Sequence, residues 1–483
     1  MSEETNAPAS DAVTVNVVTR VEEYLKPDMP NVDKIAKMAR ICYRNEKDND
    51  HEADVRIIKN CIKNGHESVL EHGAISLFIN PSPSNDTAVF SKMLDGNPNV
   101  DFNRIWMSVQ SDAERKYCER FMDPELFSKF DPDSPEKRLL PCYLADIRAW
   151  RQIVREKMFI ATSNSNQLLI VLLFKVVYEL NKTDGENLFF GDIIADFNEM
   201  LKNQTLKDAM ILNENAEKNL KDFTVEGIAK FYFYVDNTVI AGQAADCATF
   251  SVILTTDRAT THQLVRHRKM VAYSQESQRY VNYDKKGYRC MPLTVESSKF
   301  PPDFIEDYDR GAVRSTSNAY IEWRKAMQDA FQHYHNLQHI YDDETGKSDL
   351  VLPSETCRGV LPNDTATTIG VTWLRSTGFI NLCYWRLDSH AQYAIRSTLA
   401  RVVVNACLKD HPFFAVIKID IVLGWLKLIK EQKLLNDNDI IDRCIDIWTK
   451  RDAAIKKYVK EEMKKHQQNV AENKDGEGQT EVK

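Results

Sequence analysis

Apolar residues recur three and four positions apart in much of the chain, and this spacing predicts a mainly helical protein. Residues 32–43 follow it directly after Asn31, a residue type that commonly caps helix N-termini, so a capped helix is expected there. The same spacing predicts further helices over 52–63, 145–157, 166–181 and 317–341, and two amphipathic helices between 413 and 460.

Two short segments have the pattern of strands. They are 74–79, AISLFI, and 250–254, FSVIL. The region between them, 81–245, has loops rich in Pro, Asn, Asp and Ser, and we interpret it as an inserted module; a separate domain would give the same pattern. Together these elements predict a helix-rich α+β fold.

The expected helix over 52–63 should end at an Asn-Gly pair, which would place His66 directly beyond a helix C-terminus. Ser68 and Glu71 then have the spacing of a capping box and predict another short helix.

Later in the chain, Thr255 or Thr256 should cap a helix that brings the triplet RHR to its C-terminal end, where cations are favoured. Ser389 and Gln392 have capping-box spacing before a further apolar helix. Arg386 would then lie at the break between two helices, with its side chain free to reach a ligand.

Composition indicates an ordinary soluble protein of 483 residues, with 43% hydrophobic and 28% charged residues. Its 16 Gly and 16 Pro are few for this length, which favours long helices. The longest apolar stretch, 168–174, is too short to cross a bilayer, and the N-terminus lacks a basic leader, so a cytoplasmic protein is expected. Ten scattered cysteines without a CxxC pair predict reduced thiols, not zinc ligands or disulfides.

These patterns divide the chain into a core and flanking segments. Polar residues 1–14 and 461–483 are expected to be disordered tails, and 412–460 a helical extension. The core would then comprise 15–80 and 246–411, split by the insertion.

Positive charge is concentrated in one region of an otherwise acidic protein. The net charge is −8, but residues 257–289 hold eight Lys or Arg against three Asp or Glu. Because an acidic surface does not attract nucleic acid or anionic membranes, this focus predicts a pocket for a small anion. A solvated basic turn is the alternative.

Four motifs, in order, resemble the flavin-dependent thymidylate synthase family. They are KNGHESVLEH at 63–72, THQLVRHR followed by YSQESQRYVNY, CRGVLPN at 357–363, and the N-x4-R-x4-AQ-x2-IR pattern spanning 381–396. The resemblance implies a mainly helical α+β core, a homotetramer with shared active sites, and conversion of dUMP to dTMP. It also implies FAD as cofactor, with NADPH and 5,10-methylenetetrahydrofolate as co-substrates.

The resemblance assigns roles to individual residues. Arg386 would be catalytic, stabilising negative charge on the uracil ring, and His66 would lie beside the flavin ring. The positions matched to FAD contacts are Ser68, Arg266, His267, Arg268, Gln275 and Asn381. Those matched to dUMP contacts are Gln263, Arg266, Gln275, Glu276, Ser277, Gln278, Arg279, Arg358 and Arg386, with Arg358 supplied by another subunit. No cysteine is assigned a covalent role, and no GxGxxG or P-loop occurs to hold phosphates.

Two departures from the family pattern stand out. Eight residues, not seven, separate RHR from Ser277, and the interval from Leu361 to Arg386 is also one residue longer. Within that interval, Arg375 has no certain counterpart. These changes admit a catalytically inactive relative that binds a nucleotide or scaffolds a partner. A nucleic-acid-binding protein is a further alternative, disfavoured by the acidic total.

Other polar clusters favour structural interpretations. His335 and His339 share a helix face, but no acidic or cysteine ligand is evident near them in the sequence, so no metal is predicted. Arg148 and Arg151 faintly resemble the family's last motif and are interpreted as mainly structural. His72 and His262 are also expected to form structural hydrogen bonds.

Overall fold

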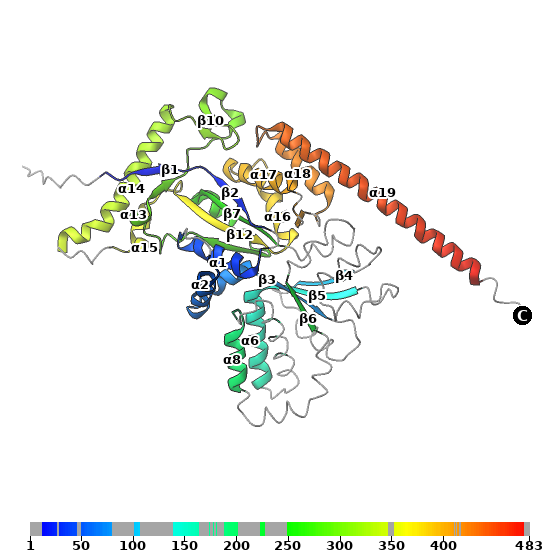
Figure 1. Cartoon of the computed structure of the whole chain (residues 1–483). Coiled ribbons are helices and arrows are strands. Elements are labelled where there is room, and N and C mark those ends of the chain that lie inside the picture. Colours follow the sequence, from blue (N-terminus) through cyan, green and yellow to red (C-terminus); the bar gives the residue numbers. More distant parts are fainter. Residues whose placement is uncertain are drawn as a thin grey trace, which may run out of the picture.

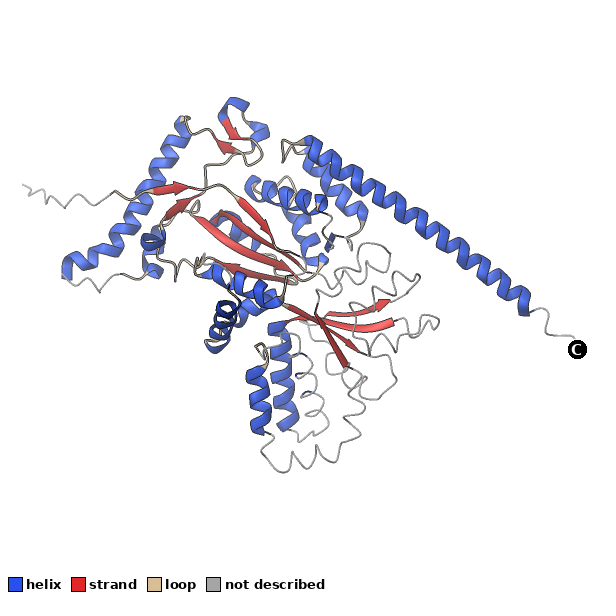
Figure 2. Ribbon diagram, in the orientation of Figure 1, coloured by secondary structure: helices blue, strands red, loops and turns tan. Residues whose placement is uncertain are grey.

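A computed structural model describes most of the chain, and Figures 1 and 2 show its arrangement. The described ranges are 12–26, 29–45, 50–79, 101–106, 139–163, 188–200, 223–227, 249–345, 352–409 and 417–477, with single positions at 173, 177, 180, 411, 413 and 414. The expected helix over 166–181 therefore lies almost entirely outside the described residues. The expected α+β class is confirmed: helices pack against two four-stranded sheets.

The first sheet is antiparallel and has the order β2-β7-β12-β8. Its strands are β2 (Val21–Tyr24), β7 (Phe250–Asp257), β12 (Ala366–Trp373) and β8 (Val271–Gln275). The expected strand at 250–254 is confirmed and extends three residues further. β7 and β12 are almost wholly buried, so apolar and small polar residues occur on both faces rather than on one.

Helices cover both faces of this sheet. Val252 and Leu254 belong to the core cluster formed with the C-terminal helices, whereas Ile253 packs against Met38 and Ile41 of α1 (Asn31–Cys42) on the other face. The C-terminal helices lie together beside the sheet in Figure 1. They are α16 (Ser376–Arg386), α17 (Tyr393–Leu408), α18 (Ile419–Glu431) and α19 (Asn438–Glu477).

The second sheet is also antiparallel and has the order β4-β5-β3-β6. Its strands are β4 (Asp101–Trp106), β5 (Leu139–Asp146), β3 (Ala74–Ile79) and β6 (Phe223–Gly227). Only β3 comes from outside the expected insertion, and its bounds match the prediction.

The described part of the expected insertion does not form a core of its own. Its helices α6 (Ile147–Ser163) and α8 (Gly191–Met200) run side by side in Figure 2. They share one hydrophobic cluster with α1 and α2 (His51–Lys63), as Trp150 and Ile193 illustrate. These helices therefore support the segment that contains His66.

Smaller elements complete the other side of the molecule. β1 (Val15–Val17) pairs in parallel with β9 (Tyr288–Cys290), and β10 (Ile305–Asp307) pairs with β11 (Ala312–Val313). The long helix α14 (Asn318–Thr345) confirms the helix expected over 317–341. α13 (Tyr283–Lys286), α15 (Ser354–Cys357) and the 3-10 turn η7 (Arg358–Val360) lie next to it.

The expected tails differ from the structure where it describes them. Val13 is buried, and its backbone N–H donates to Oε1 of Gln332, so ordered structure begins before residue 15. α19 continues to Glu477, so residues 461–477 are helical and not disordered. Their sequence is polar, and its Glu, Lys and Gln residues favour a solvated helix. Among the described helices, none is long and apolar enough to span a membrane.

Candidate functional site

The RHR triplet follows α12 (Arg258–Leu264), a short helix between strands β7 and β8. Its N-cap is Asp257, whose carboxylate accepts from the backbone N–H of Thr260 at 2.6 Å. The expected caps Thr255 and Thr256 are wrong: both precede the N-cap position, which is the last residue of β7. A buried ion pair of 2.8 Å with Arg20 also holds Asp257, so the start of α12 is fixed to the N-terminal segment.

A tyrosine fixes the turn after α12. The hydroxyl of Tyr273 lies 2.7 Å from the carbonyl oxygen of Leu264 and 2.6 Å from that of His267. Because the tyrosine belongs to β8, it ties the RHR turn to the first sheet, β2-β7-β12-β8, which we call the central sheet. Arg268 adds a weaker bond of 3.4 Å from Nε to the carbonyl oxygen of Val265.

The extra residue of this motif falls at a turn with unusual backbone geometry. Met270 has a φ of +51°, in the left-handed region that residues with a side chain seldom adopt. Its carbonyl accepts from the N–H of Leu374 at 2.9 Å. A Cβ added to Gly378 would lie 2.4 Å from the carbonyl oxygen of Lys269. The two segments that are one residue longer than the family pattern therefore pack directly on each other.

Three of the predicted site residues form one hydrogen-bonded group. Arg386 Nε donates to Nε2 of His267 at 2.9 Å, and one of its terminal nitrogens donates to Oε1 of Gln263 at 3.3 Å. An accepting Nε2 means that His267 is neutral, with its proton on Nδ1. Burial and the charge of Arg386 both lower the pKa of His267, in agreement with that state.

Positive charges accumulate around this group without neutralisation. Within the described ranges, no carboxylate lies within ion-pair distance of Arg266, Arg268 or Arg358, and all three are exposed. Burial and Arg266 lower the pKa of Arg386. Burial lowers the pKa of Arg258, and the neighbouring charge of Arg358 lowers it as well. Uncompensated guanidinium groups at one place are typical of sites that bind anions.

The same positive charges also act on His262 of α12. Burial, Arg258 and Arg266 lower the pKa of His262. His262 is exposed at the helix surface, and no structural hydrogen bond of its side chain occurs among the described residues. The expectation that it stabilises a turn is therefore not supported.

The segment after β8 contains the residues matched to dUMP, and they lie in different environments. Gln275 donates to Oγ1 of Thr261 at 2.7 Å, which orients its amide beside α12. Glu276 is buried, with its carboxylate 3.2 Å from Arg289. Burial raises the pKa of Glu276, although the charge of Arg289 opposes this. Glu276 thus lies beneath the segment and not on its surface.

Ser277, Gln278 and Arg279 follow at the surface. The N–H of Ser277 donates to the carbonyl oxygen of Cys42 at 3.0 Å, which fixes this segment to the C-terminus of α1. Arg279 pairs with Glu355 of α15 at 3.3 Å, with half of each side chain exposed. Such an exposed pair contributes little stability, so an anion can compete for Arg279 at small cost.

His66 and Ser68 belong to the segment that follows α2. His66 precedes the 3-10 helix η1 (Glu67–His72), and its Nδ1 is 3.4 Å from the hydroxyl of Tyr43. Both side chains line a cavity of about 250 Å³ with residues of α1 and α2. The Tyr43 ring also lies 5.9 Å from that of Tyr280. α1 therefore links the His66 segment to the Ser277 segment, although no hydrogen bond joins His66 to Arg386 among the described residues.

A buried charge network, which sequence reasoning missed, holds η1 in place. Arg151 of α6 is fully buried and pairs with Glu67 at 2.9 Å and with Asp192 of α8 at 2.7 Å. Arg155 contacts the same two carboxylates. Burial opposes ionisation of Glu67, but hydrogen bonds from the two arginines outweigh it and lower its pKa. The sequence signal was the arginine spacing on one face of α6.

His72 is structural, as expected. Its two ring nitrogens lie 2.8 Å from the hydroxyl of Thr372 and 3.0 Å from that of Ser274, on β12 and β8. The ring is completely buried, and burial followed by the charge of Lys34 lowers its pKa to about 3. The seven cysteines whose side chains the structure describes are free thiols. One expectation was wrong: an acidic side chain, Asp284, does lie beside His335 and His339.

Comparison with known proteins places this arrangement in a family. A family model described as thymidylate synthase complementing protein matches residues 25–84 and 196–413, more than half of the chain. The chain belongs to this family. The resemblance to flavin-dependent thymidylate synthases is thereby confirmed at the level of the family.

Similar proteins include flavin-dependent thymidylate synthases from two bacteria. That of Geobacter sulfurreducens is 33% identical over 141 residues, which are 29% of this chain and 48% of the relative. That of Clostridium tetani is 30% identical over 155 residues, 32% of this chain and 56% of the relative. This family member thus spans about half the length of the curated relatives it matches.

One solved structure similar to this family member is the UMP/dUMP methylase PolB from Streptomyces cacaoi bound with 5-Br dUMP. The two sequences are 19% identical, and the match covers 38% of this chain and 75% of that chain, with a TM-score of 0.27. The family assignment rests on the family model and not on this likeness.

Proposed function

We propose that this protein is a flavin-dependent thymidylate synthase, which methylates dUMP reductively to dTMP with FAD, 5,10-methylenetetrahydrofolate and NADPH. The observation that carries the proposal is the group of arginines around Arg386 and His267, which has no carboxylate partners among the described residues. In a chain of this family, dUMP and FAD are the anions that such a group would neutralise.

The residues present fit a flavin dinucleotide. Arg266 and Arg268 offer exposed guanidinium groups for a pyrophosphate, and neutral His267 offers an imidazole beside them. Gln275, Asn381 and Ser68 would supply uncharged hydrogen-bonding groups, and His66 would face the flavin ring from the cavity below α1. When bound, FAD would carry the one-carbon group and supply the hydride.

Arg386 would act on the uracil ring. Adding a carbon at C5 builds negative charge on that ring, and a guanidinium held in place stabilises the charge as it develops. His267 and Gln263 accept from Arg386 without neutralising it, because neither is an anion in this state. A carboxylate at either position would instead weaken the charge available to the substrate.

The phosphate of dUMP would be held by the segment after β8. Ser277 and Arg279 would contact it, and an anion would displace the exposed Glu355 from Arg279. Gln278 would lie beside them, while buried Glu276 would support the segment through Arg289. We further propose a homotetramer in which Arg358 reaches the phosphate of a neighbouring subunit, consistent with its exposure and its lack of a carboxylate partner among the described residues.

The decisive experiment uses the purified full chain. Bound flavin is measured from its visible absorbance, and NADPH oxidation is followed with and without dUMP. We expect a yellow protein, or one that FAD reconstitutes, whose NADPH oxidation accelerates with dUMP and which forms dTMP when methylenetetrahydrofolate is added. A protein that binds dUMP but never FAD would support the inactive relative instead. A protein that binds neither would overturn both assignments.

A further inference from the structure

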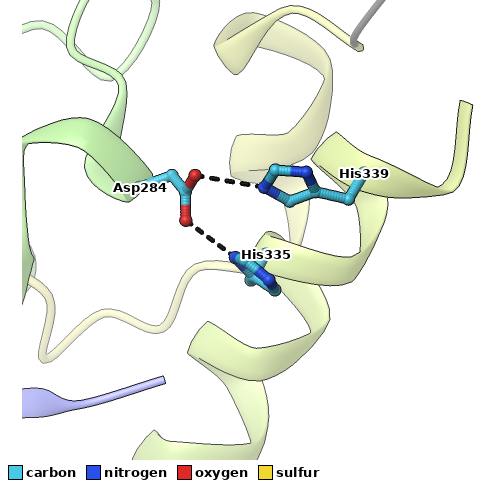
Figure 3. Close-up of side chains that lie close together, drawn as sticks. All are labelled: Asp284, His335 and His339. Carbon is cyan, nitrogen blue, oxygen red and sulfur yellow. Dashed lines mark hydrogen bonds and ion pairs between the residues drawn. The ribbon is translucent and has the colours of Figure 1, made fainter. Parts of the chain in front are cut away.

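Three side chains outside the proposed active site converge at the junction of α13 and α14. Asp284 comes from α13, and His335 and His339 come from one face of α14 (Figure 3). The carboxylate oxygens of Asp284 lie 2.7 Å from Nδ1 of His335 and 3.1 Å from Nε2 of His339. One ligand atom from each residue lies within 4.8 Å of the others.

We propose that Asp284, His335 and His339 bind a divalent transition-metal ion, with Zn²⁺ as the best match. Two imidazoles and one carboxylate are the donor set that such ions prefer. In a tetrahedral site with bonds of about 2.0 Å, neighbouring ligand atoms lie roughly 3.3 Å apart. The separation of 3.1 Å between Asp284 and His339 is close to that value, whereas Asp284 and His335, at 2.7 Å, would have to move apart when an ion binds.

The surroundings of the three residues resemble those of a metal site. The hydroxyl of Tyr288 donates to Oδ1 of Asp284 at 2.7 Å and so orients the carboxylate from outside the triad. Burial opposes ionisation of Asp284, but hydrogen bonds from Tyr288, His335 and His339 outweigh it and lower its pKa.

The triad is also open enough for an ion to enter. The side chains of His335, Asp284 and His339 are 22%, 27% and 42% exposed. Three protein ligands leave the fourth position of a tetrahedral site for water. Lys285 and Lys286 are exposed on α13, and no ion pair joins either of them to Asp284 among the described residues.

A metal here would join two elements that support the proposed phosphate site. α13 follows the segment that contains Arg279, and α14 contacts α15 through Gln338, whose Nε2 lies 3.4 Å from the Ser354 hydroxyl. α15 in turn provides Glu355, the partner of Arg279. The ion would thus hold α13 and α14 together. This inference does not depend on the proposed reaction.

Metal binding can be tested directly on the purified full chain. After treatment with a chelator, the protein is titrated with Zn²⁺ against a chromophoric competitor, and with Co²⁺, whose visible spectrum reports a tetrahedral site. We expect one equivalent of tight binding in the wild type and at least a 100-fold weaker affinity in His335→Gln/His339→Gln. His333→Gln is the matched control, because His333 is exposed on α14 outside the triad, and it should bind like the wild type.

Two further measurements distinguish the loss of a metal ligand from misfolding of the variant. Tyr288→Phe keeps all three ligands and should weaken Zn²⁺ binding by about 10–100-fold. Zn²⁺ should raise the thermal midpoint of the wild type and of His333→Gln, but not that of the single variant His339→Gln. Equal binding by the wild type and by His339→Gln, or no binding of Zn²⁺ at micromolar concentrations, would overturn the proposal.

Discussion

Arg386 and Arg151 show two opposite uses of an arginine side chain. Arg151 is fully buried, and two carboxylates neutralise it. Arg386 donates only to uncharged acceptors among the described residues, His267 and Gln263, and so keeps its charge for a ligand. Removing Arg151 should therefore affect the fold, whereas removing Arg386 should affect the reaction.

Replacing Arg386 tests its proposed role. Arg386→Ala should lower dTMP formation by about 100- to 1,000-fold, the usual cost of losing one donor to a developing negative charge. Arg386→Lys should recover only part of the activity, because an ammonium cannot reproduce the planar fork. Arg314→Ala, which removes an exposed arginine of the β11–α14 connection, is the control. Turnover by Arg386→Ala at the wild-type rate would show that another residue stabilises the charge.

His72 makes stability depend on pH. Its folded-state pKa of about 3 lies below the ordinary value of 6.5, so protonation favours the unfolded chain. The contribution is fully present above pH 6.5 and is lost progressively as the pH falls toward 3. From pH 7 to pH 5 the loss should be about 2 kcal/mol for this residue.

Thermal unfolding at pH 7 and pH 5 measures this effect. His72→Gln should be less stable than the wild type at pH 7, but it should lose less stability between the two pH values. His390→Gln, at a histidine whose side chain is 93% exposed, should show the wild-type dependence. An equal loss in His72→Gln and the wild type would contradict the assignment.

Individual site residues were predictable where local sequence order identifies them. Gln263, His267 and Arg386 were assigned from motifs, and the structure brings them together. Contacts between distant residues were not predictable in this way. Asp284 was missed as a neighbour of His335 because 51 residues separate them, and their approach depends on how α13 packs against α14.

The contact between the Lys269–Met270 turn and α16 shows how neighbouring elements accommodate the two longer intervals. Gly378 lets the turn approach the helix that contains both Asn381 and Arg386. A side chain at this position would have to displace either the RHR turn or the N-terminus of α16. The two insertions thus meet at one packed interface.

Gly378→Ala should disturb this interface. Its Cβ would meet the Lys269 carbonyl oxygen, so we expect a loss of about 1–3 kcal/mol in unfolding free energy and weaker FAD retention. Gly424→Ala is the matched control, because Gly424 also lies in a helix, α18, and its Cβ would enter open space. That variant should gain about 0.5–1 kcal/mol. Identical stability changes in the two variants would show that the contact does not constrain the turn.

Helix α6 should prove essential for the position of η1. Arg151→Ala would leave Glu67 and Asp192 with one arginine fewer, and breaking such a buried pair costs about 3–5 kcal/mol. Arg148→Ala, on the same helix, removes a side chain that is 46% exposed and should cost no more than about 1 kcal/mol. Chemical denaturation of both variants measures the difference, and similar midpoints would count against the network.

Helices and strands were largely predictable from apolar spacing, but their caps were not. Asp257 caps α12 because β7 extends beyond the predicted strand, through Thr255 and Thr256. Gln392 is the N-cap of α17, yet no side-chain cap bond forms there, so the expected capping box is wrong. Capping depends on where tertiary pairing ends a neighbouring strand or turn, which local spacing does not specify.

The C-terminal helix α19 has two parts with different roles in the assembled chain. Ile441, Cys444 and Trp448 are buried in the core cluster of the central sheet, whereas the helix beyond them extends away from the rest of the molecule (Figure 1). Asp446 and Lys450, four residues apart, form an exposed ion pair of the kind that suits a solvated helix. Composition did not predict the helical order of this region.

Two changes to α19 separate these roles. Trp448→Ala should cost about 3–5 kcal/mol, because it empties a buried position. Deleting residues 461–483 should leave the thermal midpoint nearly unchanged, since the core residues of α19 precede the deletion. A large loss on deletion would indicate that the distal helix has a packing partner in the native assembly.

The order of strands in the central sheet has a consequence for synthesis on the ribosome. β2 pairs with β7, Val21 with Thr255, and β7 then pairs with β12, which ends at Trp373. The first strand therefore waits while some 230 residues are added before Thr255 is made, roughly 12 to 47 seconds at about 5–20 residues per second. During that time β2 lacks its partner strand, so chaperone demand should be greatest before translation reaches the end of β7.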